Sequence, residues 1–470
     1  MTIPHPVEPW RVKTVEAIRQ TDRAYREHAL REAGWNPTLL RSEDVAVDLF
    51  TDSGTSAMSD RQWAVLMQGD EAYAGARSFY LLRQEVRAHY GFEHVVPVHQ
   101  GRAGENIVSQ LLIRPGHHVA GNMYFTSTRA HQERNGAVFH DVIIDEAHDP
   151  TSEHPFKGDV DPAKLRAFIK KHGPDAIPYL SIGATVNMAG GQPISLASLA
   201  TVREIADAHS LPVVLDTARA VENAYFIKQR ESGWADTSIA DILRAMCDLA
   251  DVAIMSAKKD SMVNIGGWIG IRDPDLAERA RALVLLYEGL HTYGGMAGRD
   301  MEALAQGIVE SVREENIAAR IGQVAYLGHR LIDAGVPVVR PIGGHCVCVD
   351  ALATLPHISR EEFPAQTLVA ALYADTGIRG VERGALSAGR DPVTGENRYP
   401  PLEFVRLAIP RRVYTQTHMD VVADSVIRLH TRREQIVRGL EFTHEPPHLR
   451  FFQARFRPLG GDSIFDSDTV

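Results

Sequence analysis

The 470-residue chain has few of the features that mark membrane, nucleic-acid-binding or disulfide-stabilised proteins. Its three cysteines, Cys247, Cys346 and Cys348, are too few for a disulfide scaffold and fit a reducing cytosol. It has no long apolar run without charges, and residues 1–6 lack the apolar core of a secretion signal. The net charge is −10 with no basic stripe, which makes nucleic acid and anionic membranes poor partners. We therefore expect a cytoplasmic protein that acts on a small molecule.

Metal-binding motifs are also missing. The 21 histidines show no zinc spacing such as His-Glu-x-x-His, and His117-His118 is typical of a turn. Cys346 and Cys348 alternate in a strand-like run, so they would share one face. This pattern predicts that they pack in a core, because a metal site would need further ligands.

Apolar runs and helical patterns alternate through the middle of the chain. One helix is expected over residues 195–209, with Ser195 as its N-cap. Alternation of this kind predicts an α/β fold with a mostly parallel sheet. The expected strands are 117–121, 137–144, 177–183, 211–216, 251–256 and 265–271.

From about residue 313 the pattern changes to helices around an antiparallel-looking sheet. We expect a large domain over 59–312 and a smaller α+β domain that combines 1–58, an N-terminal arm, with 313–470. The tail from residue 458 onward is rich in Gly, Ser and acidic residues, which predicts a frayed end. The expected strands of the smaller domain are 337–339, 346–349 and 403–409.

The segment Ser256-Ala257-Lys258-Lys259-Asp260 is the clearest chemical signal. It follows the apolar run 251–255, which predicts a buried strand. Burial or a neighbouring cation lowers the pKa of a lysine and supplies the neutral amine that attacks an aldehyde. The segment therefore predicts a Schiff-base lysine that holds pyridoxal phosphate, and either lysine could be the anchor. The alternative is a solvated lysine pair on a loop.

Two further strand ends carry polar groups that this cofactor requires. The run 211–215 ends in Asp216, whose carboxylate could keep a pyridine nitrogen protonated, and Arg219 could reach the phenolic oxygen. Asn187 follows the strand-like run 177–182, where a cofactor or substrate oxygen would lie. The alternatives are a helix-capping Asp and a turn Asn.

Two other segments carry groups that bind anions. Gln100-Gly101-Arg102 precede a helical pattern, so backbone N–H groups and a guanidinium could hold a phosphate. Arg406 lies inside an alternating apolar strand, and a buried guanidinium needs an anion such as an amino-acid carboxylate. The alternatives are an ordinary strand-to-helix turn and a structural ion pair.

With these motifs, several longer blocks resemble the β-eliminating lyases, pyridoxal-phosphate enzymes of the aspartate-aminotransferase-like superfamily that act on tyrosine or tryptophan. The resemblance implies fold type I, with a large domain built on a mostly parallel sheet and a smaller α+β domain. It also implies a homotetramer with active sites at a dimer interface, which Tyr73 and Tyr293 could reach from a neighbour. The resembling blocks are 8–11, 49–55, 69–75, 222–228, 293–295 and 449–452.

Three positions resemble the tyrosine-splitting branch of this family. Thr126 stands where the tryptophan enzymes carry Asp, Arg383 resembles an arginine that contacts phenol, and Phe451-Phe452 stand where the tryptophan enzymes place His. A buried polar partner discriminates strongly, because the wrong substrate leaves it unpaired. The resemblance thus implies reversible β-elimination of L-tyrosine to phenol, pyruvate and ammonia. The alternatives are a sister lyase for a ring-substituted tyrosine or tryptophan, and a catalytically silent relative, which the intact lysine, aspartate and arginine set disfavours.

The resemblance also implies a role for each site residue. Lys259 would anchor the cofactor and remove the α-proton, and Tyr73 would protonate the leaving ring carbon. Thr126 and Arg383 would orient the phenol oxygen, and Phe125 would stack on the pyridine ring. A potassium ion would be bound by oxygen ligands from Glu71, Gly54 and Asn264. The remaining implied residues are Asp216, Arg219, Asn187, Gln100, Gly101, Arg102, Ser256 and Lys258 for the cofactor, and Arg406, Thr51, Ser53, Phe451 and Phe452 for the substrate.

A few positions depart from the family pattern. The chain reads Ala103-Gly104 where relatives tend to read Gly-Ala, which could alter the phosphate loop slightly. Val381, Leu290 and His291 also differ from the tyrosine branch. We expect such changes near the ring pocket to alter discrimination by ~1–3 kcal/mol per methylene, and so to affect the tolerated ring substituents rather than the reaction.

Overall fold

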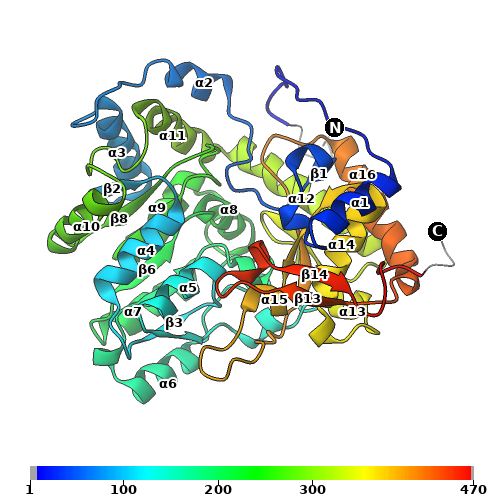
Figure 1. Cartoon of the computed structure of the whole chain (residues 1–470). Helices are drawn as coiled ribbons and strands as arrows, with labels where there is room; N and C mark the ends of the chain where they lie inside the picture. The colour runs from blue at the N-terminus through cyan, green and yellow to red at the C-terminus, as the bar shows by residue number, and fades with distance from the viewer. Residues whose placement is uncertain (1–7, 467–470) are drawn as a thin grey trace.

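The largest element of the computed structural model, which describes residues 8–466, is a seven-stranded sheet in the order β2-β8-β7-β6-β5-β3-β4 (Figure 1). β8 runs antiparallel to both of its neighbours, and the other pairs are parallel. The predicted mostly parallel sheet is confirmed, with every predicted strand present. The strands are β2 (His94–Val98), β3 (His118–Gly121), β4 (Val138–Asp141), β5 (Leu180–Gly183), β6 (Val213–Asp216), β7 (Val252–Ser256) and β8 (Gly267–Ile271).

Helices cover both faces of this sheet, and each strand sends alternate side chains to opposite faces. In β7, Ala253 and Met255 belong to the core on one face, while Val252 and Ile254 belong to the core on the other. The hydroxyl of Ser195 caps α7 as predicted. The helices are α2 (Asp60–Leu66), α3 (Arg77–Tyr90), α4 (Gly101–Leu112), α5 (Thr126–Arg134), α6 (Pro162–His172), α7 (Leu196–Asp207), α8 (Ala220–Arg230), α9 (Ile239–Asp248), α10 (Pro274–Tyr287) and α11 (Gly298–Ser311).

A second, three-stranded antiparallel sheet lies beside the first, in the order β11-β12-β9. Its core also takes up residues from the N-terminal part of the chain, including Leu30, Trp35 and Leu49. Its strands are β9 (Cys346–Asp350), β11 (Val381–Arg383) and β12 (Phe404–Ala408); two-stranded ribbons pair β1 (Val47–Asp48) with β10 (Ile378–Arg379) and β13 (Leu440–His444) with β14 (Arg455–Pro458). The helices of this part are α1 (Arg23–Glu32), α12 (Glu314–Asp333), α13 (Ala351–Thr354), α14 (Pro364–Thr376), α15 (Ala385–Ala388) and α16 (Gln416–Thr431).

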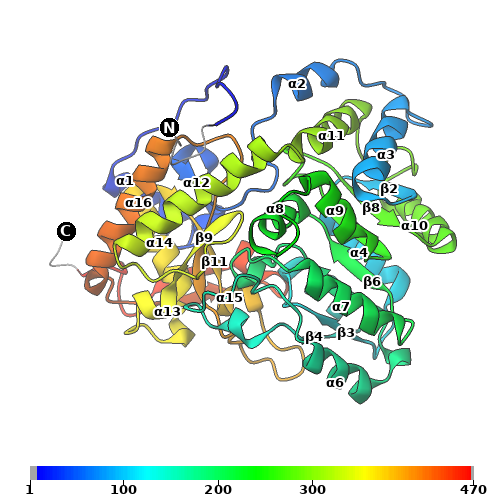
Figure 2. The ribbon, with the colours of Figure 1, turned by 180° about the vertical axis from the view of Figure 1, so that it is seen from behind.

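The long helix α12 joins the two halves, as Figure 2 shows. Ile317 and Ile321 near its start pack in the core of the large sheet, while Val324 and Leu327 pack in the core of the small one. The exact domain boundaries at residues 58 and 312 stay a prediction, because the helix contributes to both cores.

The prediction of a frayed C-terminal tail was wrong for the residues up to 466. Ile464 and Phe465 are buried in the core of the small sheet. The amide of Val437 donates a hydrogen bond to the carbonyl of Ile464 at 2.9 Å. Two apolar side chains were enough to dock a segment whose polar composition indicated disorder. Residues 467–470 of that predicted tail lie outside the described residues.

Two smaller predictions also need correction. His118 is the first residue of β3 and not part of a turn, because its strand pairs on both sides within the sheet. Residues 337–339 form only a single bridge, from Val338 to Val349. Across residues 8–466, none of the helices combines the length and the apolar character needed to cross a membrane.

Candidate active site

A cavity of about 260 Å³ lies where the carboxyl ends of the large sheet's strands face the small sheet. A larger cavity of about 370 Å³, between Trp10 and Arg412, contains none of the predicted cofactor residues. Of the predicted residues, Tyr73, Glu71, Gly54 and Asn264 do not line the first cavity. Those that do are Thr51, Ser53, Gln100, Gly101, Arg102, Phe125, Thr126, Asn187, Asp216, Arg219, Ser256, Lys258, Lys259, Arg383, Arg406, Phe451 and Phe452.

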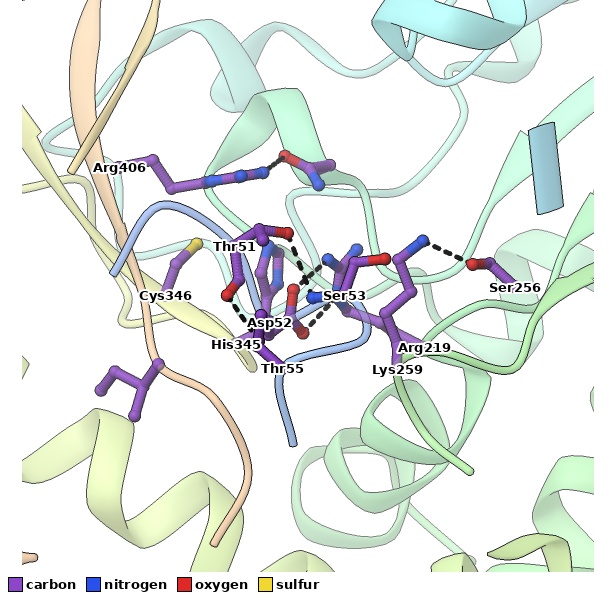
Figure 3. A network of polar contacts seen from close by, with 12 residues as sticks. Thr51, Asp52, Ser53, Thr55, Arg219, Ser256, Lys259, His345, Cys346 and Arg406 are labelled. Atoms are coloured by element: carbon purple, nitrogen blue, oxygen red, sulfur yellow. Dashed lines mark hydrogen bonds and ion pairs between the residues drawn. The ribbon is translucent and has the colours of Figure 1, made fainter. Parts of the chain in front are cut away.

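Lys259 projects into this cavity just beyond the end of β7 (Figure 3). Its Nζ donates a hydrogen bond of 2.8 Å to Oγ of Ser256. Burial and the charge of Arg219 lower the pKa of Lys259 to about 8, although Asp216 opposes the shift. A fraction of the amine is therefore neutral near neutral pH, as a nucleophile toward an aldehyde requires.

Lys258 lies at the same wall and has a different environment. Burial and the nearby charge of Arg102 lower its pKa. Its side chain runs closely past Gly54, where an added Cβ would lie 2.7 Å from Cε of Lys258. It thus shares a positively charged side of the cavity with Arg102, which suits contact with an anion.

Asp216 ends β6 and faces the cavity. Its Oδ1 accepts a hydrogen bond of 2.9 Å from the amide of Ala218. Burial raises the pKa of this carboxyl, while Lys259 and Arg219 act against the rise. A cationic ring nitrogen placed here would give the buried carboxylate a close partner, so the residue fits the pyridinium of pyridoxal phosphate.

The start of α4 forms the predicted phosphate end of the cavity. Gln100 precedes the helix and Gly101 is its first residue. A Cβ at Gly101 would lie 2.6 Å from Cβ of Ser256, so only glycine allows the helix start to approach the end of β7 this closely. The N-terminal end of a helix fits a phosphate through its N–H groups and positive dipole end, although the N–H of Ala103 here donates to the carbonyl of Gln100 at 3.1 Å.

The pair Ala103-Gly104 lies at the start of α4 rather than in the loop before it, and its expected effect on that loop stays a prediction. A Cβ at Gly104 would lie 3.1 Å from Cγ2 of Ile254. Gly104 therefore sets how closely α4 packs on the sheet.

The side chain of Arg406 projects from β12 (Figure 3). Its Nη1 donates a hydrogen bond of 2.7 Å to Oδ1 of Asn187, and its Nη2 donates one of 3.0 Å to the carbonyl of Phe50. The buried Nε has no partner among the described residues. One edge of the guanidinium is thus left for an anion, as a substrate carboxylate requires.

Arg383 ends the neighbouring strand β11 and is also buried at the cavity wall. Burial and the charge of Arg406 lower the pKa of Arg383 to about 9. Within residues 8–466, its Nε and Nη1 find no hydrogen-bond partner. Buried polar groups are nearly always paired, so these donors indicate that a ligand completes the site.

Further unpaired polar atoms and two aromatic rings lie in the same wall. Thr126 begins α5, and its hydroxyl, like that of Tyr124, is buried and unpaired within the described part of the chain. The rings of Phe451 and Phe452 lie 3.9 Å apart, and the guanidinium carbon of Arg383 lies 5.0 Å from the Phe451 ring centre. This wall can hold an aromatic ring on its apolar side and an oxygen at its polar end.

Tyr73 does not reach the cavity within one chain. Its side chain is 58% exposed, and its ring lies 5.0 Å from that of Tyr293. Its hydroxyl accepts a hydrogen bond of 3.3 Å from the amide of Leu290. Tyr293 is only partly exposed, so the exposed ring of Tyr73 is what a second copy of the chain could contact.

The predicted potassium ligands are divided between two places. Gly54 and Asn264 lie together, since the carbonyl of Gly54 accepts a hydrogen bond of 2.9 Å from the side chain of Asn264. The exposed carboxylate of Glu71 instead pairs with Arg299 at 3.1 Å.

The positions that depart from the family pattern near the expected ring pocket do not line the cavity that one chain forms, and their effect on the tolerated ring substituents stays a prediction. Val381 packs in the core of the small sheet. Leu290 and His291 lie beside Tyr73 in the chain segment after α10, and none of the three residues lines the cavity.

A buried charge network behind the cavity was missed in the sequence. Burial alone would raise the pKa of Asp52, but the charges of Arg219 and Arg411 hold it well below its usual range. Nη2 of Arg411 also pairs with Glu222 at 2.5 Å. No local signal could reveal this network, because its members come from distant segments of the chain.

The comparisons with known proteins agree with this geometry. A family model described as "Beta-eliminating lyase" matches residues 48–425. The chain is 59% identical to a tyrosine phenol-lyase of Symbiobacterium sp. (strain SC-1) over 96% of this chain and 98% of that protein. It is 57% identical to a tyrosine phenol-lyase of Nostoc punctiforme over 96% of each.

Solved structures establish the fold. A Thermus thermophilus aspartate aminotransferase variant matches with a TM-score of 0.58 at 15% identity, covering 89% of this chain and all of that one. An aromatic aminotransferase from Pyrococcus horikoshii OT3 matches with a TM-score of 0.59 at 14% identity, covering 86% and 100%. The predicted fold is confirmed: it is the aspartate-aminotransferase-like fold type I of pyridoxal-phosphate enzymes. Within that class, the chain belongs to the β-eliminating lyase family.

Proposed function

We propose that this chain is a pyridoxal-phosphate-dependent carbon–carbon lyase that splits L-tyrosine into phenol, pyruvate and ammonia. The observation that carries the proposal is the buried guanidinium of Arg383, whose Nε and Nη1 lack partners among residues 8–466 and which lies beside the closely packed rings of Phe451 and Phe452. Tryptophan would leave those donors unpaired, while the oxygen of a phenol ring would accept from them. The named relatives support this choice, since they are tyrosine phenol-lyases over nearly the same length.

Different residues of the cavity would bind the cofactor and bind the substrate. Pyridoxal phosphate, when bound, supplies an aldehyde for the substrate amine and a cationic ring that accepts charge from the α-carbon. Asp216 would keep the ring nitrogen charged, Arg219 and Asn187 would hold the phenolic oxygen, and the start of α4 would hold the phosphate. Arg406 fixes the substrate carboxylate through its free edge, with Thr51 and Ser53 nearby.

Proton transfers are assigned to two side chains. Lys259 removes the α-proton, because its lowered pKa leaves a neutral amine available as a base. Tyr73 donates a proton to the ring carbon that leaves, while Arg383 and Thr126 hold the ring oxygen. Positioned proton transfer contributes roughly 10²–10⁴-fold to rate.

Tyr73 can take this role only if two chains share a site, and we propose a homotetramer with active sites at a dimer interface. The exposure of Tyr73 supports this arrangement. Glu71, on the same segment, would then complete a potassium site with the backbone oxygens of Gly54 and Asn264, which suit a hard cation. We also place the reaction in the cytoplasm, and the three buried free cysteines fit a reducing compartment.

The test is a substrate panel with the purified protein and pyridoxal phosphate. Phenol and pyruvate should appear in equal amounts from L-tyrosine, with much slower pyruvate release from L-tryptophan. Faster turnover of tryptophan or of a ring-substituted tyrosine than of tyrosine would favour the sister lyase instead.

A further inference from the structure

Three histidines from separate segments meet at the edge of the large sheet. His118 begins β3, His140 lies in β4 and His172 ends α6. One ring nitrogen of each lies within 4.8 Å of the corresponding nitrogens of the other two. Nδ1 of His118 and Nε2 of His140 are 3.0 Å apart, and the rings of His118 and His172 have centres 3.9 Å apart. Within residues 8–466 this is the one such group of metal-ligating side chains.

The fold holds the three rings on one side of the sheet. In the parallel register, His118 pairs with Val138 and Ala120 with His140, so both histidines share the face that carries Ala120. Ala120 belongs to the core that α6 helps to form, through Leu165 and other residues. The last turn of α6 therefore places His172 over the two strand histidines; Figures 1 and 2 show α6 next to β3 in both views.

The electrostatics of the cluster favour neutral imidazoles at His140 and His172. Burial and the charges of His172, His118 and Lys171 lower the pKa of His140 to about 4. Burial and the charges of His118 and Lys171 also lower the pKa of His172. Neutral imidazole is the form that binds a metal, so His140 and His172 need not release a proton near pH 7.

We propose that His118, His140 and His172 bind a divalent zinc-class metal ion, with water as a fourth ligand. Tetrahedral zinc with Zn–N distances of ~2.0–2.1 Å places its ligand nitrogens about 3.3 Å apart. Nδ1 of His118 and Nε2 of His140, 3.0 Å apart, are already close to this spacing. A rotation of the His172 ring at the end of α6 would bring a ring nitrogen of His172 to the same ion. The competing interpretation is a hydrogen-bonded imidazole pair with His172 stacked on it.

The proposed metal site is separate from the proposed active site. A bound metal would stabilise the fold rather than take part in the reaction. His118 lies at the start of β3, whereas the cavity is lined by residues that follow the end of this strand, from Asn122 to Phe125. β4 is the edge strand of the sheet. A metal bound here would tie that edge strand to β3 and α6.

The proposal is tested by zinc titration of tag-free holoprotein after treatment with a chelator. Isothermal titration calorimetry should show one zinc ion bound per chain. His140→Gln and His172→Gln should each weaken that binding by at least ~100-fold, since loss of even an outer hydrogen-bonded partner costs ~10–100-fold. Added zinc should also raise the melting temperature of the unaltered protein and not that of the variants.

His28→Gln is the matched control, because His28 is an exposed histidine on α1, next to Glu32. It should bind zinc as the unaltered protein does. If His140→Gln fails to fold, His172→Gln still tests the proposal. His172 is the last residue of α6, where a substitution disturbs the fold less than one inside a strand. Zinc binding that is absent from the unaltered protein, or that is equal in all variants, would overturn the proposal.

Discussion

Arg219 and Asp52 form a buried two-point ion pair, with Nε–Oδ2 and Nη2–Oδ1 distances of 3.0 and 2.6 Å (Figure 3). The pair joins a residue at the start of α8 to the segment that follows β1, across the two halves of the chain. Arg219 is thus oriented toward the cavity before any ligand arrives, which reduces the cost of ordering it on binding.

Asp52→Asn should strongly destabilise the protein. The change keeps the shape of the side chain but leaves Arg219 and Arg411 without their buried counter-charge, which costs ~3–5 kcal/mol of unfolding free energy. Urea denaturation at pH 7 measures the loss. The matched control is Asp60→Asn, because Asp60 pairs with Lys13 on the surface and should change little. Equal effects of the two changes would contradict the role of the buried network.

The pKa of Lys259 predicts how cofactor capture depends on pH. A lysine with a pKa of about 8 is half neutral at pH 8, whereas an ordinary lysine with a pKa of ~10.4 is almost wholly charged there. The rate at which cofactor-free protein takes up pyridoxal phosphate should therefore rise up to about pH 8 and then level off. Stopped-flow absorbance of the bound cofactor measures it.

Lys258→Ala provides the control for that experiment. If Lys259 is the anchor, this variant keeps the pH profile and binds the cofactor more weakly, because it loses a cation at the phosphate side. If Lys258 is the anchor, the variant captures no cofactor covalently. A rate that keeps rising to pH 10 in the unaltered protein would contradict the lowered pKa.

Shared active sites predict complementation between two inactive variants. Lys259→Ala removes the base and Tyr73→Phe removes the proton donor, so each alone should lose nearly all tyrosine turnover. In a symmetric dimer, random exchange of the two chains restores roughly a quarter of the sites. Activity should therefore return after mixing and subunit exchange. No recovery, with mixed dimers present by mass spectrometry, would place Tyr73 outside the neighbour's site.

The potassium proposal predicts a specific response of Glu71. Glu71→Gln should weaken activation by potassium about tenfold or more, because the ion loses its charged ligand. Activity measured against potassium concentration, with sodium held as the balancing salt, gives the shift. Glu43→Gln is the control, since Glu43 is an exposed carboxylate that pairs with Arg41 at the surface. An unchanged potassium dependence in Glu71→Gln would contradict the assignment.

The sequence was most informative where function needs residues close together along the chain. The strand ends with Asp216 and Lys259 combine an apolar run with a polar residue, and both patterns are local. The same reasoning missed Asp52 as a counter-charge, because its partners come from α8 and from the segment after β12. It also missed the meeting of His118 with His140 and His172, because strand register and helix placement decide it.

The tail shows a second limit. Its composition of Gly, Ser and acidic residues indicated a frayed end, yet Ile464 and Phe465 are buried. Composition averages over a segment, while docking depends on one or two apolar side chains that find space in an existing core.

The most direct test of the central claim compares two substrates on Arg383→Ala. L-tyrosine needs its ring oxygen held while the ring carbon is protonated, whereas an amino acid such as S-methyl-L-cysteine carries its own leaving group at Cβ. We predict that Arg383→Ala lowers kcat/KM for tyrosine ~10²–10³-fold, the size of effect that follows loss of a hydrogen-bond donor at a reacting oxygen. The rate of pyruvate release from S-methyl-L-cysteine should stay within a few-fold of that of the unaltered protein. Equal losses on both substrates would contradict a phenol-binding role for Arg383 and the proposed choice of tyrosine.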